Sequence, residues 1–354
     1  MKLTVVTTTY NQEKYIGQAI EGMLMQKTNF PFQILISNDC STDATEEILK
    51  KYKSENPDKI IIVQNEKNIG AMKNFINTLS LVNDSEYVAL CDGDDFWTDK
   101  NKLQKQIDFL EKNKDYTICF HKSKLFYENG EKESLIIPQN IPEVTTINDL
   151  VEQNYIVANS VVYRWMFNNK KIKDVFPADI VPGDYYIHLM HAQNGKIKMI
   201  NEVMSAYRRH SNGMWWTNDK SDKEEFSLKY GKKFLNFYNA ADKNIKLPAN
   251  AFHDQRKDII YNIIVAYIKN NKFEELKKMF TTEKDMNISR EVMNEIVNRN
   301  IWFQDYLAHR DEEIESTKSQ LEELQYLRNE LDSIKNSRWW KIRNFIKNTD
   351  DRRV

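Results

Sequence analysis

Three carboxylates surround one glycine directly after an apolar run, in the stretch Tyr87-Val88-Ala89-Leu90-Cys91-Asp92-Gly93-Asp94-Asp95. The apolar run is typical of a strand that is buried on both faces, as in a parallel sheet. Asp92, Asp94 and Asp95 repel one another unless a positive charge lies between them. A hard divalent cation with oxygen ligands meets that need and can bridge to a phosphate. A solvated acidic turn is the simpler interpretation of the same residues.

The segments around this acidic stretch alternate between strand and helix patterns through the first 120 residues. Strands are predicted at 3–10, 32–38, 60–63, 87–91 and 116–120, and helices at 13–25, 70–81 and 102–112. A further helix is expected after Asp43, which with Glu46 forms a capping box. Such alternation predicts right-handed βαβ units and an α/β fold with a mostly parallel sheet. Polar clusters after the first, second and fourth strands then lie at one edge, where open α/β sheets bind ligands.

Residues 121–215 show a mixed pattern. A hairpin is predicted at 124–127 and 135–137 around Asn129-Gly130, and a strand at 158–163. The sequence Val181-Pro182-Gly183-Asp184 opens a helix, and residues 196–207 return as a strand. Residues from 226 to about 280 are helical, and their aromatic and isoleucine side chains indicate packing surface rather than a cofactor site.

The region from 302 to 334 contains no proline or glycine. Ile314, Thr317, Leu321 and Leu324 repeat with heptad spacing, and the pattern resumes at Leu327 after a three-residue skip. This spacing predicts a short coiled coil with a stammer, and hence a homo-oligomer. A single helix packed on its own domain is the alternative.

The last segment, residues 337–354, is basic and aromatic. Trp339, Ile342 and Phe345 can share one helical face with Arg338 and Lys341 at its margin. Such a helix suits peripheral contact with an anionic membrane. Docking on the protein's own surface explains the same residues equally well.

Composition bounds the class of protein. The chain has 354 residues, 41% hydrophobic and 29% charged, with a net charge of −1, which gives no electrostatic reason to expect nucleic acid binding. Cys40, Cys91 and Cys119 form no CxxC pair, which argues against a zinc site and favours a reducing compartment. With no targeting segment and no run of eighteen apolar residues, we expect a cytoplasmic protein that contacts the inner face of the membrane peripherally.

Four motifs in order resemble family 2 glycosyltransferases of the GT-A fold. They are Thr9-Tyr10-Asn11-Gln12-Glu13-Lys14-Tyr15-Ile16, Asn38-Asp39-Cys40-Ser41-Thr42-Asp43, Asn68-Ile69-Gly70 with Asn74, and Asp92-Gly93-Asp94-Asp95. The resemblance covers residues 1–215 and implies a Rossmann-like sheet with flanking helices. We therefore divide the chain into a nucleotide-sugar-binding and catalytic domain (1–218), a helical region (219–300), a coiled-coil-like helix (301–336) and an amphipathic tail (337–354).

The resemblance implies a metal-dependent site for a nucleotide-diphosphate sugar. Asp94 is the expected direct ligand of Mn²⁺ or Mg²⁺, with Asp92 near the ribose and the metal, and Asp95 supporting either one. The segment Tyr207-Arg208-Arg209-His210 resembles a family segment that approaches the donor phosphates. Arg208 or Arg209 would neutralise the diphosphate, and His210 would contact phosphate or metal, although a basic segment of this kind is also common as solvated surface.

The same resemblance assigns the nucleotide-binding residues. Thr8 and Tyr10 are expected near the base, and Glu13 on the ribose side. Asp39 resembles the residue that accepts a hydrogen bond from the uracil ring, which favours a UDP-sugar. Asn68 belongs to the same set. Asp43 is interpreted as a helix cap.

Inverting transfer needs a base on the acceptor side of the sugar. Family members usually place it in a Glu-Asp pair at a helix start, and Gly183-Asp184 matches that position with Gly in place of Glu. Asp184 is therefore the predicted base, and a helix N-cap is a compatible second role. Trp215 and Trp216 follow in a loop, where they would stack on a sugar, close over the donor or simply pack.

Three functional hypotheses come from these observations. The first is an inverting, metal-dependent glycosyltransferase of bacterial surface-polysaccharide biosynthesis, which moves a hexose or N-acetylhexosamine to a glycan or lipid-linked acceptor. The second is a sugar nucleotidyltransferase, which usually has a glycine-rich phosphate loop where Thr7-Thr8-Thr9-Tyr10-Asn11 has none. The third is a non-catalytic assembly partner with the same fold. We choose the first, because the acidic trio and Asp184 are all present.

Overall fold

The computed structural model describes residues 1–82, 84–130, 132–167, 171–177, 179–211, 213, 223–280 and 282–299. The chain divides into two compact units, residues 1–271 and 272–354. The predicted coiled coil, the amphipathic tail and the Trp215-Trp216 pair lie outside the described residues.

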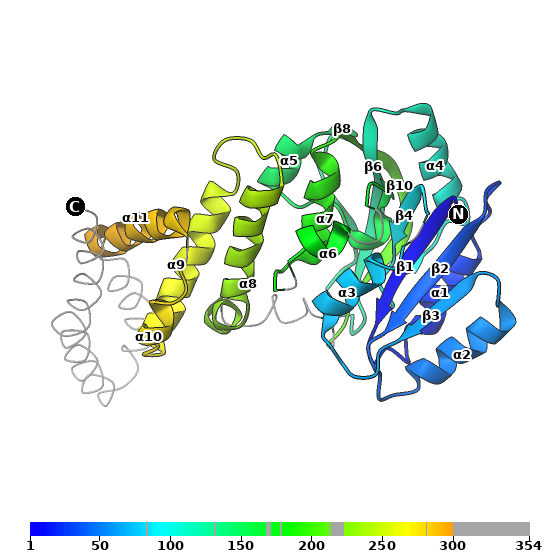
Figure 1. Cartoon of the computed structure of the whole chain (residues 1–354), viewed down its shortest axis with the longest axis horizontal. Coiled ribbons are helices and arrows are strands. Elements are labelled where there is room, and N and C mark those ends of the chain that lie inside the picture. Colours follow the sequence, from blue (N-terminus) through cyan, green and yellow to red (C-terminus); the bar gives the residue numbers. More distant parts are fainter. Residues whose placement is uncertain are drawn as a thin grey trace. The chain divides into compact units, whose positions relative to one another are not determined.

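A single mixed sheet forms the centre of the first unit (Figure 1). Its strands are β1 (Leu3–Thr9), β2 (Phe32–Asn38), β3 (Ile60–Gln64), β4 (Tyr87–Leu90), β5 (Phe96–Trp97), β6 (Tyr116–Tyr127), β7 (Leu135–Ile137), β8 (Val144–Thr145), β9 (Val162–Arg164) and β10 (Lys196–Arg209). The order across the sheet is β3-β2-β1-β4-β9-β6-β10-β5, with β7 paired to β6 and β8 paired to β10. The β3-β2-β1-β4 block and the β6-β10 pair are parallel, and β9 joins them in antiparallel pairing.

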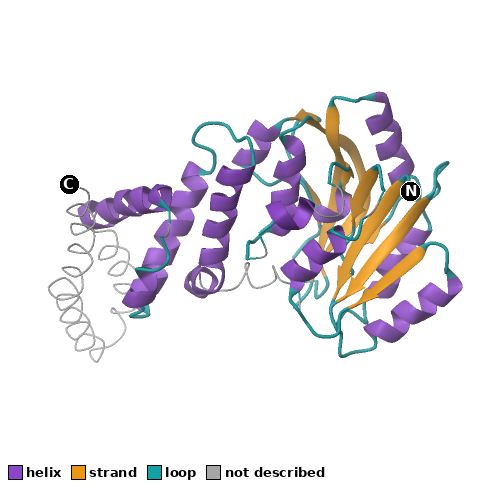
Figure 2. Cartoon of the chain, in the orientation of Figure 1, coloured by secondary structure: helices purple, strands orange, loops and turns teal. Residues whose placement is uncertain are grey.

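Helices flank the strands on both faces (Figure 2). The helices of the first unit are α1 (Ile16–Leu24), α2 (Thr45–Glu55), α3 (Ala71–Leu79), α4 (Lys102–Lys112), α5 (Ile147–Glu152), the 3₁₀ turn η1 (Ala158–Ser160), α6 (Lys171–Val175), α7 (Gly183–Ala192), α8 (Lys223–Asn244) and α9 (His253–Lys269), of which α8 and α9 lie away from the sheet. The described part of the second unit contains α10 (Phe273–Leu276) and α11 (Glu283–Arg299).

Both faces of the central strands are buried, as the continuous apolar run before the acids predicts. On one face, Leu3, Val5 and Ala89 belong to the core cluster that also contains the apolar residues of α1, α2 and α4. The alternate side chains Val6 and Val88 point to the opposite face and are also buried. Period-two alternation of this kind with both sides apolar requires helices on both sides of the sheet.

The polar clusters after β1, β2 and β4 lie at one edge of the sheet, as predicted. Strand β1 pairs in parallel register with both β2 and β4, so their carboxyl ends coincide. Beyond the strands, the main-chain N–H of Asp39 donates to the Thr9 carbonyl at 2.9 Å, and that of Gly93 donates to the Thr8 carbonyl at 3.2 Å. The chain order therefore brings three loops to one place.

Two local predictions are wrong. The helix after Asp43 has Ala44 as its N-cap and no capping box; Asp43 Oδ1 accepts from the Thr45 N–H at 3.0 Å, while Glu46 pairs with Lys50. The other Asp43 oxygen is bound by the Glu13 N–H, which explains why it does not cap the helix as expected. The strand predicted at 158–163 is strand only from Val162, because residues 158–160 form η1.

The predicted hairpin is confirmed, but its first arm belongs to a longer strand. Strand β6 runs without interruption through residues 116–127, and β7 pairs with it antiparallel. On its other side β6 is paired with β10, whose register is irregular at three positions. These irregularities set where the end of β10 lies relative to residues 92–95, which follow β4 and are called the acidic turn below.

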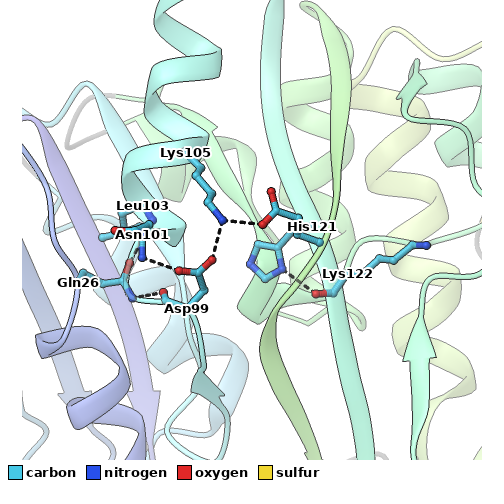
Figure 3. A network of polar contacts seen from close by, with 8 residues as sticks. Gln26, Asp99, Asn101, Leu103, Lys105, His121 and Lys122 are labelled. Carbon is cyan, nitrogen blue, oxygen red and sulfur yellow. Dashed lines mark hydrogen bonds and ion pairs between the residues drawn. The ribbon is translucent and has the colours of Figure 1, made fainter.

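A polar network joins the end of α1 to the start of α4 (Figure 3). Gln26 donates to the Asp99 carbonyl at 2.8 Å and accepts from the Leu103 N–H at 3.1 Å. Asp99 in turn accepts from the Asn101 N–H at 2.7 Å and from Lys105 Nζ at 2.8 Å. These contacts hold the segment that follows the acidic turn against the sheet.

Lys102, at the start of α4, is completely buried. Its Nζ donates to Gln106 Oε1 at 2.9 Å and lies 4.1 Å from the centroid of the Trp97 ring. Burial lowers the pKa of Lys102 to about 7, because a desolvated ammonium is disfavoured. Between this value and the ordinary lysine pKa, the unfolded chain binds a proton that the folded chain lacks, so stability contributed through Lys102 increases with rising pH.

Replacing Lys102 with Met is therefore expected to change the pH dependence of stability. Wild-type stability should gain about 2 kcal/mol relative to Lys102→Met between roughly pH 7 and pH 9, since the variant lacks the titrating amine. Urea unfolding at the two pH values measures this difference. Lys105→Met is the matched control on the same helix, because the hydrogen bonds that Lys105 donates to Asp99 and Glu202 raise its pKa away from this window. A pH-independent difference would mean that Lys102 remains charged in the fold.

Helices α8 and α9 lie side by side in the first unit, and Arg256 joins them. This buried side chain donates from Nη1 to Asn239 and from Nη2 to Asp242, each at 2.7 Å. Of the aromatic side chains predicted to be packing surface, Phe237 and Tyr238 are buried, and Phe234 and Tyr267 are half-buried. The Phe237 ring stacks on Tyr185 of α7, with 5.2 Å between the ring centroids. Among the described residues, no helix is both long enough and apolar enough to cross a membrane.

Candidate active site

The acidic turn after β4 approaches the loop after β1 so closely that only glycine fits at position 93. A Cβ there would lie 2.3 Å from Gln12 Oε1 and 3.0 Å from Thr9 Oγ1. Those two side chains hydrogen-bond each other at 2.7 Å, which fixes them in place. The absence of a side chain at Gly93 therefore sets how near the acids lie to the first loop.

Asp95 faces inward and is almost completely buried. Its Oδ2 accepts from Asn159 Nδ2 at 2.8 Å, and its Oδ1 accepts from the Arg208 main-chain N–H at 2.9 Å. Burial, together with the charges of Asp94 and Asp92, raises the pKa of Asp95 well above its ordinary value. These contacts give Asp95 a structural role, in which it ties the acidic turn to η1 and to the end of β10.

Asp94 meets His210, which the chain supplies just beyond β10. Asp94 Oδ2 lies 3.0 Å from His210 Nε2. The imidazole is 3% exposed and the carboxylate side chain 20% exposed, so the pair is accessible from one side only. The ring of Tyr15 lies against the imidazole, with 4.6 Å between the ring centroids. The sequence prediction that these two residues belong to one site agrees with this geometry.

Asp92 is the first residue of the acidic turn, and its carboxyl group interacts electrostatically with Asp184 of α7. Burial, then the charges of Asp94 and Asp184, raises the pKa of Asp92 to about 7, and a hydrogen bond from Thr8 opposes the shift. The effect of Asp184 on this carboxyl places the two acids in one region, although 92 positions separate them in the chain. A carboxylate that is this costly to ionise near neutral pH is suited to a cation.

Asp184 lies in the first turn of α7. Its Oδ1 accepts from the Tyr185 N–H at 2.9 Å, but the N-cap is Pro182 and no side chain caps this helix, so the predicted cap role of Asp184 is wrong. Burial raises the pKa of Asp184 above its ordinary value. The preceding Gly183 has a close neighbour, since a Cβ there would lie 2.4 Å from the methyl carbon of Met72. The space that a glutamate side chain would enter at position 183 is thus occupied by a thioether from α3.

The donor atoms fit a small divalent cation. Asp94 Oδ2 and His210 Nε2 lie 3.0 Å apart, at hydrogen-bond distance, and an octahedral ion that replaced the shared proton would hold two neighbouring ligands at about the same separation. Imidazole and carboxylate are both ligands that Mn²⁺ accepts. The described residues contain no group of three His, Cys, Asp or Glu side chains that could hold a metal ion by themselves. The pair therefore suits an ion that takes its remaining ligands from phosphate and water.

The loops after β1 and β2 are joined by reciprocal hydrogen bonds. Asp43 Oδ2 accepts from the Glu13 N–H at 3.0 Å, and Glu13 Oε2 accepts from the Ala44 N–H at 2.9 Å. Glu13 thus braces one loop against the other. Thr8 is half-buried beside Asp92, whereas Tyr10 is 44% exposed.

Asp39 lies 2% exposed at the end of β2 and holds the loop that follows β3. Its Oδ1 accepts from Asn65 Nδ2 at 2.8 Å and from the Ile69 N–H at 2.9 Å, and its Oδ2 accepts from the Gly70 N–H at 2.9 Å. A carboxylate has about four acceptor positions, so one remains for a further donor. Asn68 is exposed and accepts from the same Gly70 N–H at 3.1 Å.

Arg208 donates from its side chain to protein acceptors. Its Nε binds the Asp94 carbonyl at 2.9 Å, and its Nη2 binds Gln18 Oε1 at 2.6 Å. The predicted contact with a phosphate stays a prediction.

Sequence reasoning missed Asn159, which is completely buried and donates to Asp95 and to the Ala206 carbonyl. Its Oδ1 accepts from Ser205 at 2.7 Å. The available signal was an asparagine inside an apolar run, since a buried amide needs several partners and so indicates a polar network.

The sequence of this chain is similar to those of known proteins. A family model described as glycosyl transferase family 2 matches residues 4–176. The Mycobacterium tuberculosis protein Rv1520 is 40% identical over 213 residues, which are 60% of this chain and 60% of that protein. The poly(ribitol-phosphate) β-N-acetylglucosaminyltransferase TarS of Staphylococcus aureus is 26% identical over 232 residues, 64% of this chain and 39% of TarS.

Two solved structures share the fold. TarS residues 1–349 in complex with UDP-GlcNAc superpose with a TM-score of 0.51 at 20% identity, covering 84% of this chain and 92% of that one. The mannosyltransferase PcManGT of Pyrobaculum calidifontis, in complex with GDP-Man and Mn²⁺, gives a TM-score of 0.50 at 12% identity, covering 83% and 80%. The chain spans about 60% of the length of the first curated relatives it matches.

Proposed function

This chain belongs to glycosyltransferase family 2 through residues 4–176, and on that premise we propose that it transfers a sugar from a nucleotide-diphosphate donor to an acceptor hydroxyl in surface-polysaccharide biosynthesis. The reaction is metal-dependent and inverting. The observation that carries the proposal is the convergence of the Asp94–His210 pair, Asp92 and Asp184 at the sheet edge where the loops after β1 and β2 also end.

The leaving-group side of the site is built from Asp94, His210 and Asp92. When bound there, Mn²⁺ or Mg²⁺ supplies Lewis-acid stabilisation of the charge that develops on the diphosphate. Asp94 and His210 would hold the ion. Burial and then the charges of Asp94 and Asp184 raise the pKa of Asp92 to about 7, and a bound cation would relieve that repulsion. The donor diphosphate and water would supply the remaining ligands.

The acceptor side is built around Asp184. Its carboxylate accepts the proton of the attacking hydroxyl as the new glycosidic bond forms and the bond to the diphosphate breaks. A base works best when its pKa lies near the working pH, and burial moves the pKa of Asp184 upward, in that direction. The hydrogen bond from the Tyr185 N–H fixes the carboxylate without protonating it.

The nucleotide lies over the loops after β1, β2 and β3 in this proposal. The remaining acceptor position of Asp39 takes the N–H of a uracil ring, which makes a UDP-sugar the favoured donor. Thr8 and Tyr10 flank the base, and Glu13 and Asn68 complete the loop surface. The complexes of TarS with UDP-GlcNAc and of PcManGT with GDP-Man and Mn²⁺ support a nucleotide sugar and a metal on this fold.

The acceptor is a hydroxyl of a glycan or a lipid-linked saccharide, and the site of action is the cytoplasm. The names of relatives support the pathway: TarS acts on poly(ribitol-phosphate), and the Bacillus subtilis protein TuaG is described as a putative teichuronic acid biosynthesis glycosyltransferase.

Thermal unfolding of the full chain with UDP, dTDP, GDP and CDP, each with and without Mn²⁺, tests the proposal. A nucleotide at about 100 times its dissociation constant adds about 2.7 kcal/mol, which raises the unfolding temperature of a unit of this size by about 5–10 °C. We expect that rise with UDP and Mn²⁺ together. If no nucleotide changes the unfolding temperature, the chain is a non-catalytic partner with a glycosyltransferase fold.

A further inference from the structure

Arg208 occupies a position that donor binding alone does not explain. It pairs with Phe126 in the register of β10 and β6, and its main-chain N–H is bound by Asp95. Its guanidinium turns toward the acidic turn, where Nε donates to the carbonyl oxygen of Asp94 at 2.9 Å. Nη2 donates at 2.6 Å to Gln18 of α1. Main chain and side chain of one residue therefore hold two consecutive aspartates.

Aromatic rings fix the orientation of this guanidinium. Its central carbon lies 4.8 Å from the ring centroid of Tyr15, 5.0 Å from that of Phe126 and 5.4 Å from that of Phe96. Arginine stacks on such rings and donates in a fixed plane, so three rings around it restrict the directions in which it donates. The donor that meets Asp94 is set by this packing before any ligand arrives.

The same packing reaches His210 through Tyr15. One face of the site has the Tyr15 ring in contact with both the Arg208 guanidinium and the His210 imidazole, at 4.8 and 4.6 Å. The Tyr15 hydroxyl donates to Glu128 Oε2 at 2.7 Å, which anchors the ring. Arg208 thus supports Asp94 directly and His210 through a shared neighbour.

The Asp94 atom that accepts the hydrogen bond from Arg208 has a chemical consequence. Arg208 binds the neutral main-chain carbonyl of Asp94, not its carboxylate, so the carboxylate remains available to a cation. An arginine paired with the carboxylate itself would compete with the metal for the same oxygens. The contact holds the position of Asp94 without occupying either of its carboxylate oxygens, of which Oδ2 lies 3.0 Å from His210 Nε2.

We propose that Arg208 is a positioning residue that holds Asp94 and His210 at metal-binding separation. This inference rests on the proposed function, since it assigns the pair to a divalent cation. It differs from a phosphate-binding role for Arg208, in which the guanidinium would act on the donor and not on the metal ligands.

The test measures metal and nucleotide affinity separately in the full chain. Free Mn²⁺ is titrated by electron paramagnetic resonance without nucleotide, and UDP binding is measured by calorimetry with and without Mn²⁺. Loss of a residue that orients a metal ligand typically costs about 10–100-fold in metal affinity, and we expect a loss of that size in Arg208→Gln. UDP affinity without Mn²⁺ should be unchanged in this variant.

Two further variants keep the test decisive if Arg208→Gln folds poorly. Arg208→Lys retains the charge but not the planar fork, so its Mn²⁺ affinity should fall by less. Phe126→Leu removes one of the three rings and leaves the polar atoms of Arg208 in place, and it should weaken Mn²⁺ binding in the same direction. Circular dichroism of each variant establishes that the fold is retained.

Lys124→Gln is the matched control, with the same change of charge on the neighbouring strand β6. Lys124 is exposed and pairs in register with Ala206, two residues before Arg208, so Mn²⁺ affinity should be unchanged. An equal loss in Arg208→Gln and Lys124→Gln would reveal a general charge effect and overturn the inference.

The remaining outcomes also decide the matter. If Arg208→Gln binds Mn²⁺ as the wild type does but loses UDP affinity without metal, Arg208 binds phosphate and the inference is wrong while the proposed function stands. If the wild-type chain binds neither Mn²⁺ nor any nucleotide, the proposed function and the inference both fail.

Discussion

Asp184→Asn is expected to lower kcat by about 10²–10⁴-fold, the usual contribution of a positioned general base. Asparagine keeps an oxygen for the Tyr185 N–H, so this hydrogen bond survives and only the ability to take a proton is lost. Donor affinity should remain, because the change lies on the acceptor side of the proposed site. Turnover of UDP-sugar and calorimetric UDP binding, measured on the same preparation, separate the two effects.

The unfolding temperature of Asp184→Asn distinguishes a loss of catalysis from misfolding. Burial raises the pKa of Asp184, so the folded chain binds this proton more tightly than the unfolded chain, and stability is lost as pH rises through the folded-state pKa. Removing the acid should leave the unfolding temperature at pH 8 unchanged or higher. The rate of the wild type should fall with decreasing pH at a value above the ordinary pKa of aspartate. Asp174→Asn, an exposed carboxylate on α6, is the matched control and should retain full activity. An Asp184→Asn variant with wild-type kcat would mean that Asp184 is not the base.

Asp94→Asn is expected to abolish the Mn²⁺-dependent part of UDP binding. Saturating UDP and Mn²⁺ should add about 2.7 kcal/mol to the free energy of unfolding of the wild type, and this gain should disappear in the variant. The amide has the size of the carboxylate but lacks the charge that would hold the cation. UDP binding without Mn²⁺ should be unaffected. Thermal unfolding with UDP, at a series of Mn²⁺ concentrations, measures the loss directly.

The apo form provides an independent check on this variant. The charge of Asp94 raises the pKa of both Asp92 and Asp95, so its removal relieves repulsion within the buried turn. Without ligands, Asp94→Asn should therefore be at least as stable as the wild type. Asp108→Asn, on the exposed face of α4, controls for the general effect of losing one carboxylate. If Asp94→Asn retains the full Mn²⁺-dependent shift, the cation lies elsewhere and His210 is merely hydrogen-bonded to Asp94.

Much of the fold could be predicted because local patterns and tertiary packing agree. Strand β2 and helix α4 have the predicted bounds, since each has one clear period and is closed by polar residues. The parallel arrangement of β1, β2 and β4 then follows from their alternation with helices, and it places Asp39 and Asp92 at one edge without further information.

Other features depend on partners that no local pattern reveals. Asp43 looks like a helix cap in sequence, yet one of its oxygens binds the Glu13 N–H, thirty positions earlier in the chain. The contact between the Arg208 guanidinium and the Asp94 carbonyl depends on the irregular register of β10 against β6. The role of Asn159 could not be predicted for the same reason, because its hydrogen-bond partners come from β10 and the acidic turn.

The pairing of Asp94 with His210 has a consequence for synthesis of the chain. The two residues are 116 positions apart, and β10 must be inserted between β6 and β5 before His210 reaches the acidic turn. Contacts of such long range form late, because a large loop has to close first. A nascent chain that has emerged only as far as β9 carries all three acids but not His210. Under the proposed function such a chain lacks one of the two proposed metal ligands, so the metal site would be completed only when β10 docks.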